Sequence, residues 1–128
     1  MIPAHELRIG NKVAFLLEGR KVATIIGIQP AGVRVDSFPY GLYSLEDIEP
    51  ISITEEILPE SFKPDEYGVK KHYPFGSILA SDATFLYNDD GLFFGTPGEP
   101  HMVEFKYVHT FQNFYYFLTQ GAELEFKL

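Results

Sequence analysis

Residues 7–28 read LRIGNKVAFLLEGRKVATIIGI, and this stretch decides the fold of the amino-terminal half. Apolar side chains take alternate positions over residues 7–17, apart from one step at Gly10-Asn11, and the alternation resumes over residues 22–28. A period of two is typical of β-strands that bury one face. Glu18-Gly19-Arg20 separates the two runs and predicts a tight reversal between two strands.

The following residues predict further short elements. Ile25 puts an apolar side chain on the second face of its strand, which favours a central or strongly bent strand. Pro30-Ala31-Gly32 predicts a turn, and Phe38-Pro39-Tyr40-Gly41 predicts an aromatic loop. Leu45–Ile48 has apolar residues three apart, which suits one helical turn, 3₁₀ in type. Proline at position 50 then permits only an edge or terminal strand over residues 49–53.

The number and order of these elements match a small SH3-like β-barrel over residues 1–53. Closing so small a sheet into a barrel hides its edges. Residues 54–128 predict an α+β lobe, an antiparallel sheet with one C-terminal amphipathic helix, and we expect the two lobes to pack as one compact unit. The fold class is therefore mainly β, or α+β.

In chain order the second lobe is expected to hold a short helix at 54–58 capped by Thr54, loop or edge structure at 63–75, a strand at 78–87, a hairpin turn at 88–91, a return strand at 92–94, a half-buried strand at 102–107, a helix at 109–120 ending at Gly121, and a closing strand at 124–128.

Composition narrows the function classes. The 128 residues include no cysteine, which excludes disulfides, thiolate metal sites and cysteine nucleophiles. The formal net charge of −8 opposes nucleic acid as the main partner, because a polyanion attracts basic proteins. Residues 1–8 lack the basic and apolar segments of a signal peptide, and the longest apolar runs, 13–17 and 114–118, are far shorter than the ~20 residues of a membrane span. We expect a soluble, cytoplasmic protein with no membrane partner.

Three segments carry a resemblance to a known family. They are PAHELRIGNKV at 3–13, LEDIEPISITEEIL at 45–58 and YVHTFQNFYYFLT at 107–119. Together they resemble a family of small uncharacterised proteins found in phages, prophages and mobile elements of gut bacteria. Its members usually read His-x-Leu-Gln-Asn in the last motif, where this chain has Phe111 at the leucine position. The resemblance supports the architecture and a mobile-element origin, and it implies no catalytic residues.

Motifs for catalysis or cofactor binding do not emerge. Gly27 and Gly32 have the spacing of half a phosphate loop, but Val33-Arg34 stand where Lys and Ser/Thr are required. The four histidines, His5, His72, His101 and His109, fall in different segments without metal-ligand spacing. We therefore predict no catalytic residue, no metal and no cofactor, and the sequence does not favour an enzyme.

Three groups of side chains are candidates for binding, and each also has a structural interpretation. The aromatic residues of the predicted loop and its neighbour could form a contact surface. The acidic residues could dock a basic partner or mimic nucleic-acid phosphates, although a solvated face is favoured. The histidine with its two amides could bind a ligand, although a capping or packing role at the strand–helix junction is favoured. The candidates are Phe38, Tyr40 and Tyr43; Glu46, Asp47 and Glu49; and His109, Gln112 and Asn113.

Three functions follow from these features. The favoured hypothesis is a non-catalytic protein-interaction module, an accessory protein of phage or mobile-element type, whose acidic surface sets the choice of an unknown protein partner. The second is nucleic-acid binding by the basic side chains of the first lobe. The third is an anti-defence protein that uses its acidic face, or an enzyme with an unrecognised site. The basic side chains in question are Arg8, Lys12, Arg20, Lys21 and Arg34.

Overall fold

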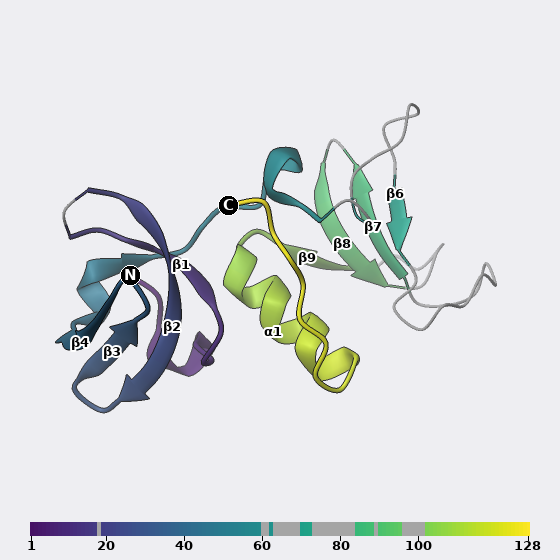
Figure 1. The fold of residues 1–128 in the computed structure, drawn as a ribbon. Helices are drawn as coiled ribbons and strands as arrows, with labels where there is room; N and C mark the ends of the chain where they lie inside the picture. Colours follow the sequence, from purple (N-terminus) through teal and green to yellow (C-terminus); the bar gives the residue numbers. More distant parts are fainter. Residues whose placement is uncertain (18, 60–61, 63–69, 73–83, 89, 96–101) are drawn as a thin grey trace. The chain divides into compact units, whose positions relative to one another are not determined.

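The computed structural model describes residues 1–17, 19–59, 62, 70–72, 84–88, 90–95 and 102–128. Within these residues the chain is mainly β, with two antiparallel sheets and one α-helix near the carboxyl end (Figure 1). The chain divides into two compact units. Unit 1 comprises Met1–Ser52 and Tyr107–Asn113, and unit 2 comprises Ile53–Lys106 and Phe114–Leu128. Unit 1 thus includes Tyr107–Asn113, which the predicted boundary between residues 53 and 54 assigns to the second lobe.

Unit 1 is built on a five-stranded antiparallel sheet in the order β4-β3-β2-β1-β5 (Figure 1). Two 3₁₀ turns belong to the same unit, and the second of them confirms the helical turn predicted before the last strand. The elements are η1 (Ala4–Glu6), β1 (Lys12–Phe15), β2 (Lys21–Gln29), β3 (Gly32–Val35), β4 (Phe38–Tyr43), η2 (Leu45–Asp47) and β5 (Ile48–Glu49).

The central strand is β2, as its apolar residues on both faces predict. Its pairing with β3 shifts register between Ile25 and Gly27. An extra residue at such a bulge bends the strand and changes which side chains face the core. Ile25 is fully buried, whereas the side chain of Ile26 is 43% exposed. The bulge therefore explains how two adjacent isoleucines fit one strand.

Aliphatic side chains dominate the core of unit 1. The β-branched residues of alternate strand positions meet on one face of the sheet, where a pleated surface packs them well. Phe15 lies among them and is 1% exposed. The buried cluster consists of Ile2, Val13, Phe15, Ala23, Ile25, Val33, Val35 and Ile48.

Two predictions for unit 1 are corrected. The expected closed barrel is not observed: within the described residues β4 and β5 are the two edges of the sheet and do not pair with each other. The expected aromatic loop at residues 38–41 is wrong, since these residues belong to β4, where Phe38 pairs with Val35 and Tyr43 pairs with Val33. Both aromatic rings pack against Phe15, and this packing outweighs the turn signal of proline and glycine.

Unit 2 contains a three-stranded antiparallel core extended by a short edge strand, in the order β6-β7-β8-β9. The predicted hairpin is confirmed, because Asn88 pairs with Gly91 across the turn, and the predicted loop-or-edge segment contributes the edge strand β6. The elements are η3 (Glu55–Ile57), β6 (Lys70–His72), β7 (Thr84–Asn88), β8 (Gly91–Gly95) and β9 (Val103–Phe105). The helix α1 (Val108–Leu118) begins in unit 1 and ends in unit 2.

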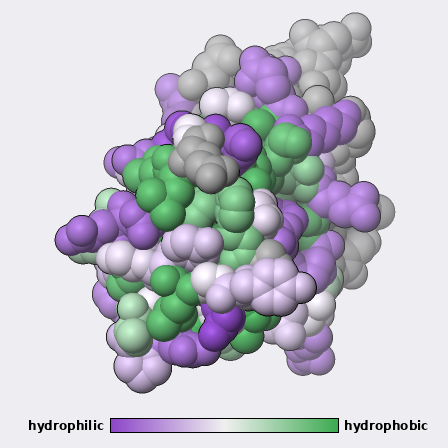
Figure 2. Space-filling model, turned by 60° about the vertical axis from the view of Figure 1, so that its left-hand side comes forward, coloured by the Kyte–Doolittle hydropathy of each residue, from purple (hydrophilic) through white to green (hydrophobic). Residues whose placement is uncertain are grey.

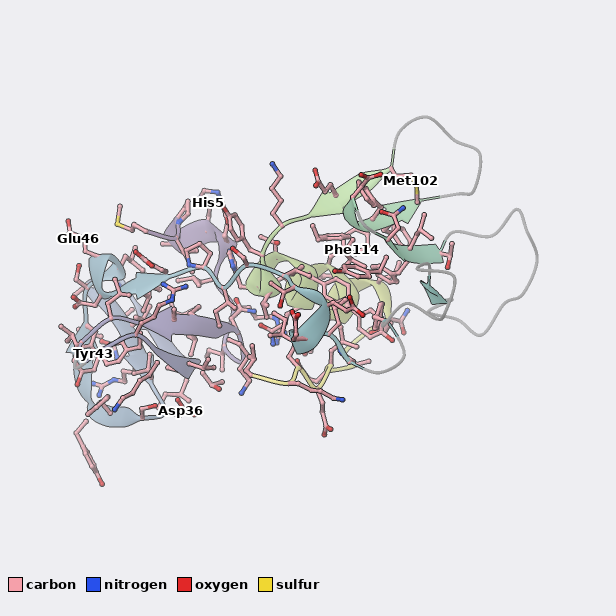
Figure 3. All side chains as sticks on the ribbon, turned by 90° about the horizontal axis from the view of Figure 1, so that it is seen from above. His5, Asp36, Tyr43, Glu46, Met102 and Phe114 are labelled. Atoms are coloured by element: carbon pink, nitrogen blue, oxygen red, sulfur yellow. The ribbon has the colours of Figure 1, made fainter. Side chains whose placement is uncertain are left out.

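Aromatic side chains form the core of unit 2. Phe85 on β7 is fully buried, and its ring lies 4.7 Å from that of Phe94, centroid to centroid. The second half of α1 supplies Phe114, whose ring lies 5.0 Å from that of Phe105. Figure 3 labels Phe114 among the side chains gathered on this sheet. Tilted and edge-on rings of this kind stabilise beyond the area that they bury.

The end of α1 departs from the predicted glycine cap. Gln120, with φ of 59°, takes the left-handed position, and its N–H donates to the carbonyl of Phe117. The N–H of Gly121 donates to the carbonyl of Tyr116 at 2.8 Å. These two bonds form a Schellman motif in which Gln120, and not the glycine, is the first residue after the C-cap Thr119.

Three further predictions concern the ends of unit 2. The closing strand expected at 124–128 is wrong: residues 122–128 form no strand, although the N–H of Lys127 donates to the carbonyl of Ile57. The short helix at 54–58 is only a 3₁₀ turn, and the Thr54 side chain makes no capping bond. Of the strand predicted at 78–87, residues 84–87 lie in β7 and residues 78–83 lie outside the described residues, as does most of the segment at 63–75.

Candidate functional site

Gln112 lies on α1, and its amide bonds to the chain segment that precedes β1. The side chain is 3% exposed. Its Oε1 accepts a hydrogen bond from the backbone N–H of Lys12 at 2.7 Å, and its Nε2 donates to the carbonyl of Gly10 at 3.3 Å. One buried amide therefore satisfies a backbone donor and a backbone acceptor of the same turn.

Asn113 makes a second and denser set of bonds to the same segment. Its Oδ1 accepts from Nδ2 of Asn11 at 2.7 Å and from Nε of Arg8 at 3.2 Å. Its Nδ2 donates to the carbonyl of Glu6 at 2.7 Å. Asn11 is itself fully buried, and its Oδ1 accepts from the Arg8 N–H at 2.7 Å. The side-chain amides of Asn11 and Asn113 thus belong to one hydrogen-bond network inside unit 1.

His109 completes this contact. Its ring is 1% exposed and stacks on Tyr107, with centroids 6.1 Å apart and planes at 19°. Nε2 lies 3.1 Å from Oε1 of Glu6. Within the described part of the chain, Nδ1 has no hydrogen-bond partner. A ligand could reach this imidazole only if α1 released the segment before β1, so the geometry gives His109 a packing and docking role.

We call Glu6–Lys12 with His109, Gln112 and Asn113 the amide clamp. Sequence reasoning singled out the three helix residues but not their partners, which lie about a hundred positions away. One signal was present: Gln112 falls on the same face of the helix as Val108, Phe111 and Tyr115, which are buried. A polar residue on an apolar helix face is expected to be hydrogen-bonded.

The aromatic candidates of β4 divide into a packed pair and an exposed residue. Phe38 and Tyr43 lie 5.5 Å and 4.9 Å from the ring of Phe15, centroid to centroid. With Leu17 these rings line an apolar notch of about 70 Å³. Tyr40, between them in sequence, is 97% exposed. The structure therefore brings two of the three into one packed surface and presents the third to solvent.

Gly41 allows this aromatic arrangement. A Cβ at position 41 would lie 2.4 Å from the hydroxyl oxygen of Tyr43 and 2.5 Å from the ring carbon that carries it. The ring cannot retreat freely, because its other side rests on Phe15. The glycine that suggested a loop in the sequence is instead required by a close approach between a side chain and the backbone.

The acidic candidates lie on η2 and β5. Ser44 caps the turn, its Oγ accepting from the N–H of Glu46 at 3.2 Å, which leaves the carboxylate of Glu46 exposed. The carbonyl of Asp47 accepts from the N–H of Leu16 at 2.9 Å, so the main chain of η2 is fixed against β1. Glu49 forms an ion pair with Arg20. Figure 3 shows where Tyr43 and Glu46 lie on unit 1.

The basic side chains of unit 1 are largely occupied by contacts within the unit. Arg8 donates to Asn113 and to the carbonyl of Ile9, and Lys12 Nζ donates to the hydroxyl of Thr24. Arg20 is paired with an acid. Among these contacts only the ion pair of Arg20 with Glu49 neutralises a charge that a phosphate backbone could use.

A hollow of about 320 Å³ beside η2 is not indicated by any sequence motif. It is mostly apolar, with Ile28, Pro30 and Leu45 in its walls and Glu46 in its lining. Two features of the sequence are compatible with such a hollow. Ile28 is an apolar residue near the end of β2, and Pro30 begins the turn that follows it. Figure 2 shows apolar side chains in separate patches on the face that it draws.

The described residues hold no group of three or more His, Asp or Glu side chains placed to bind a metal ion. No helix within them combines the length and the apolar character that crossing a membrane needs. Compared with protein-family models, with curated proteins and with solved structures, the chain has no match.

Proposed function

We propose that this chain is a non-catalytic protein-interaction module, an accessory protein of phage or mobile-element type, and that it meets its partner through β4 and η2. The observation that carries the proposal is Tyr40, a large aromatic side chain that is 97% exposed on an edge strand. Exposed tyrosines are favoured at interfaces because they bury a large area at a small cost in conformational entropy.

Acidic side chains of the same unit add to the proposal. Glu46 is exposed and Asp47 is half-buried on η2, and Glu49 is half-buried on β5. Carboxylates on the surface of a binding module raise the rate of encounter with a basic partner and reject acidic ones. The strand order, with β5 beside β1, supports an SH3-like sheet whose open edge β4 carries Tyr40.

The amide clamp supports the non-catalytic part of the proposal. His109, Gln112 and Asn113 are candidates for ligand binding from the sequence, and their described contacts are internal to unit 1. A catalytic group must reach its substrate, and the ring of His109 is 1% exposed. The net charge of −8 argues against nucleic acid as the partner, because a polyanion attracts basic proteins.

Photo-crosslinking from position 40 tests the proposal. A photoreactive phenylalanine analogue replaces Tyr40 in the full chain, and the native host cell is irradiated. We expect one discrete adduct that protease removes and nuclease leaves intact. The same analogue at Ala122, an exposed residue of unit 2, is the control and should give no such adduct. No adduct at position 40, or an adduct that nuclease digests, contradicts the proposal.

A second variant separates binding from folding. Because Tyr40 is almost fully exposed, Tyr40→Ser should change the free energy of unfolding by no more than about 0.5 kcal/mol. It should nevertheless weaken binding to the crosslinked partner about tenfold, as loss of an aromatic anchor does. Unchanged affinity for that partner would contradict a role for Tyr40.

A further inference from the structure

The hollow beside η2 lies next to the surface assigned above and adds a second feature to it. Ser44, Leu45 and Glu46 line the hollow, and the preceding residue, Tyr43, lines the aromatic notch. The hollow is half open, and exposed apolar atoms of Met1 and Ile28, which are 73% and 38% exposed, border it. We call it the η2 groove.

Glu46 is the only charged side chain among the described residues that line the η2 groove. Among the described residues of unit 1, no hydrogen bond or ion pair engages the carboxylate of Glu46, since the capping bond of the turn uses its backbone N–H. Residues 36–59 contain acids and no Lys or Arg, in a chain whose net charge is −8. An occupant that carries positive charge is therefore favoured over one that carries negative charge.

We propose that the η2 groove seats an aliphatic side chain from an extended, lysine- or arginine-rich segment of a partner protein, with Glu46 pairing with a cation beside that side chain. The inference rests on the proposed function and specifies the chemistry of the partner. It places the apolar anchor in the groove and leaves Tyr40 as a separate contact on the same partner.

The size and composition of the groove determine the anchor. About 320 Å³ is close to the lower limit of ligand pockets, so the groove holds one or two side chains and not the face of a helix. Ile28, Pro30 and Leu45 offer apolar contact, which an aliphatic side chain uses fully. In an extended segment, residues two positions apart point to the same side, so a cation two positions from the anchor can reach the rim.

A short peptide of known sequence is the probe. The peptide Lys-Lys-Leu-Lys-Leu-Lys-Lys is titrated into the full isotope-labelled chain, and amide resonances are followed by NMR. We expect the largest shifts at Ile28, Ala31 and Leu45. Two matched peptides are controls: one with glutamate in place of every lysine, and one with serine in place of both leucines. Each should bind about tenfold more weakly than the probe or not at all.

Three variants locate the binding. Ala31 is an exposed turn residue that lines the groove, so Ala31→Trp should fill the groove without disturbing the core and weaken the probe about tenfold. Glu46→Lys should weaken it about fivefold by placing a like charge at the rim. Glu125→Lys makes the same change in net charge at an exposed position of unit 2, and should leave affinity within about twofold.

The outcomes distinguish this inference from the proposed function. Equal binding of the lysine and glutamate peptides, shifts elsewhere than around the groove, or equal effects of Glu46→Lys and Glu125→Lys would each overturn the inference. Displacement of the probe by a short single-stranded DNA at the same residues would also overturn it. The crosslink from position 40 tests the proposed function independently of the groove, because it uses the native partner and no residue that lines the groove.

Discussion

The two halves of α1 are held by different chemistry. In unit 1, the first half is fixed by the amide clamp, where buried Gln112 and half-buried Asn113 bond to the residues at the start of β1 and just before it. In unit 2, the second half packs Phe114 and Tyr115 against an aromatic sheet. Apolar contacts supply free energy without fixing register, whereas hydrogen-bonded amides add little net free energy but penalise every other alignment. The comparison predicts different costs for removing each kind of contact.

The largest effect is expected in the aromatic half. Phe85 is fully buried and its ring contacts those of Phe62, Phe94 and Tyr115. Phe85→Ala should lower the free energy of unfolding by about 3–5 kcal/mol, because it removes buried area and leaves a cavity. Urea denaturation followed by circular dichroism measures the loss. A loss below about 1 kcal/mol would show that this ring is not central to unit 2.

An intermediate effect is expected in the clamp. Gln112→Ala leaves the Lys12 N–H and the Gly10 carbonyl without their partner, and should cost about 1–3 kcal/mol. The matched control is Gln29→Ala, since Gln29 is an exposed amide of the same unit, and it should stay within about 0.5 kcal/mol. Equal effects of the two variants in the same denaturation assay would contradict the clamp.

A smaller effect, of opposite sign, is expected at the end of α1. Gln120 holds a left-handed backbone with φ of 59° that glycine adopts without strain. Gln120→Gly should therefore raise the free energy of unfolding by about 1 kcal/mol or less, which is seen as a slightly higher melting temperature. Gln120→Val, whose branched side chain disfavours this backbone, should lower it. A fall in melting temperature with glycine would contradict the Schellman geometry.

The smallest effect concerns pH. Burial raises the pKa of Tyr115 above its usual value of 10.0, because it disfavours the phenolate. The unfolded chain therefore loses this proton first, and the stability that Tyr115 contributes is complete below about pH 10 and declines as the pH rises further. Tyr115→Phe should make the decline above pH 10 shallower. Tyr40→Phe, at an exposed tyrosine, serves as the control, and equal slopes for both variants would contradict the assignment.

Local signals predicted much of the fold. Period-two alternation located β1 and β2, the Asn88–Gly91 turn located the second hairpin, and the helical period located α1. The two errors in strand assignment have a common cause. Residues 38–41 carry proline and glycine, yet tertiary packing on Phe15 holds them in β4; residues 124–128 alternate, yet no strand pairs with them among the described residues. Pairing partners decide strands, and they are distant in sequence.

The candidate site was less predictable than the fold. His109, Gln112 and Asn113 were recognised as unusual, but their role depends on Glu6, Arg8 and Asn11, to which no local pattern links them. The exposure of Tyr40 beside two packed aromatic residues depends on the register shift in β4. The η2 groove depends on two turns that meet only in the folded sheet. Surface features of this kind follow from tertiary structure, which a single sequence leaves open.

A double-mutant cycle between Asn11 and Asn113 tests the central claim most directly, namely that the carboxyl-terminal motif serves the fold and leaves binding to β4 and η2. The amides meet through a bond of 2.7 Å from Nδ2 of Asn11 to Oδ1 of Asn113. The free energy of unfolding is measured for Asn11→Ala, Asn113→Ala and the double variant. The account predicts a coupling of about 1 kcal/mol or more, with the partner crosslink from position 40 retained in Asn113→Ala. Effects that add within about 0.3 kcal/mol, together with loss of the crosslink, would contradict it.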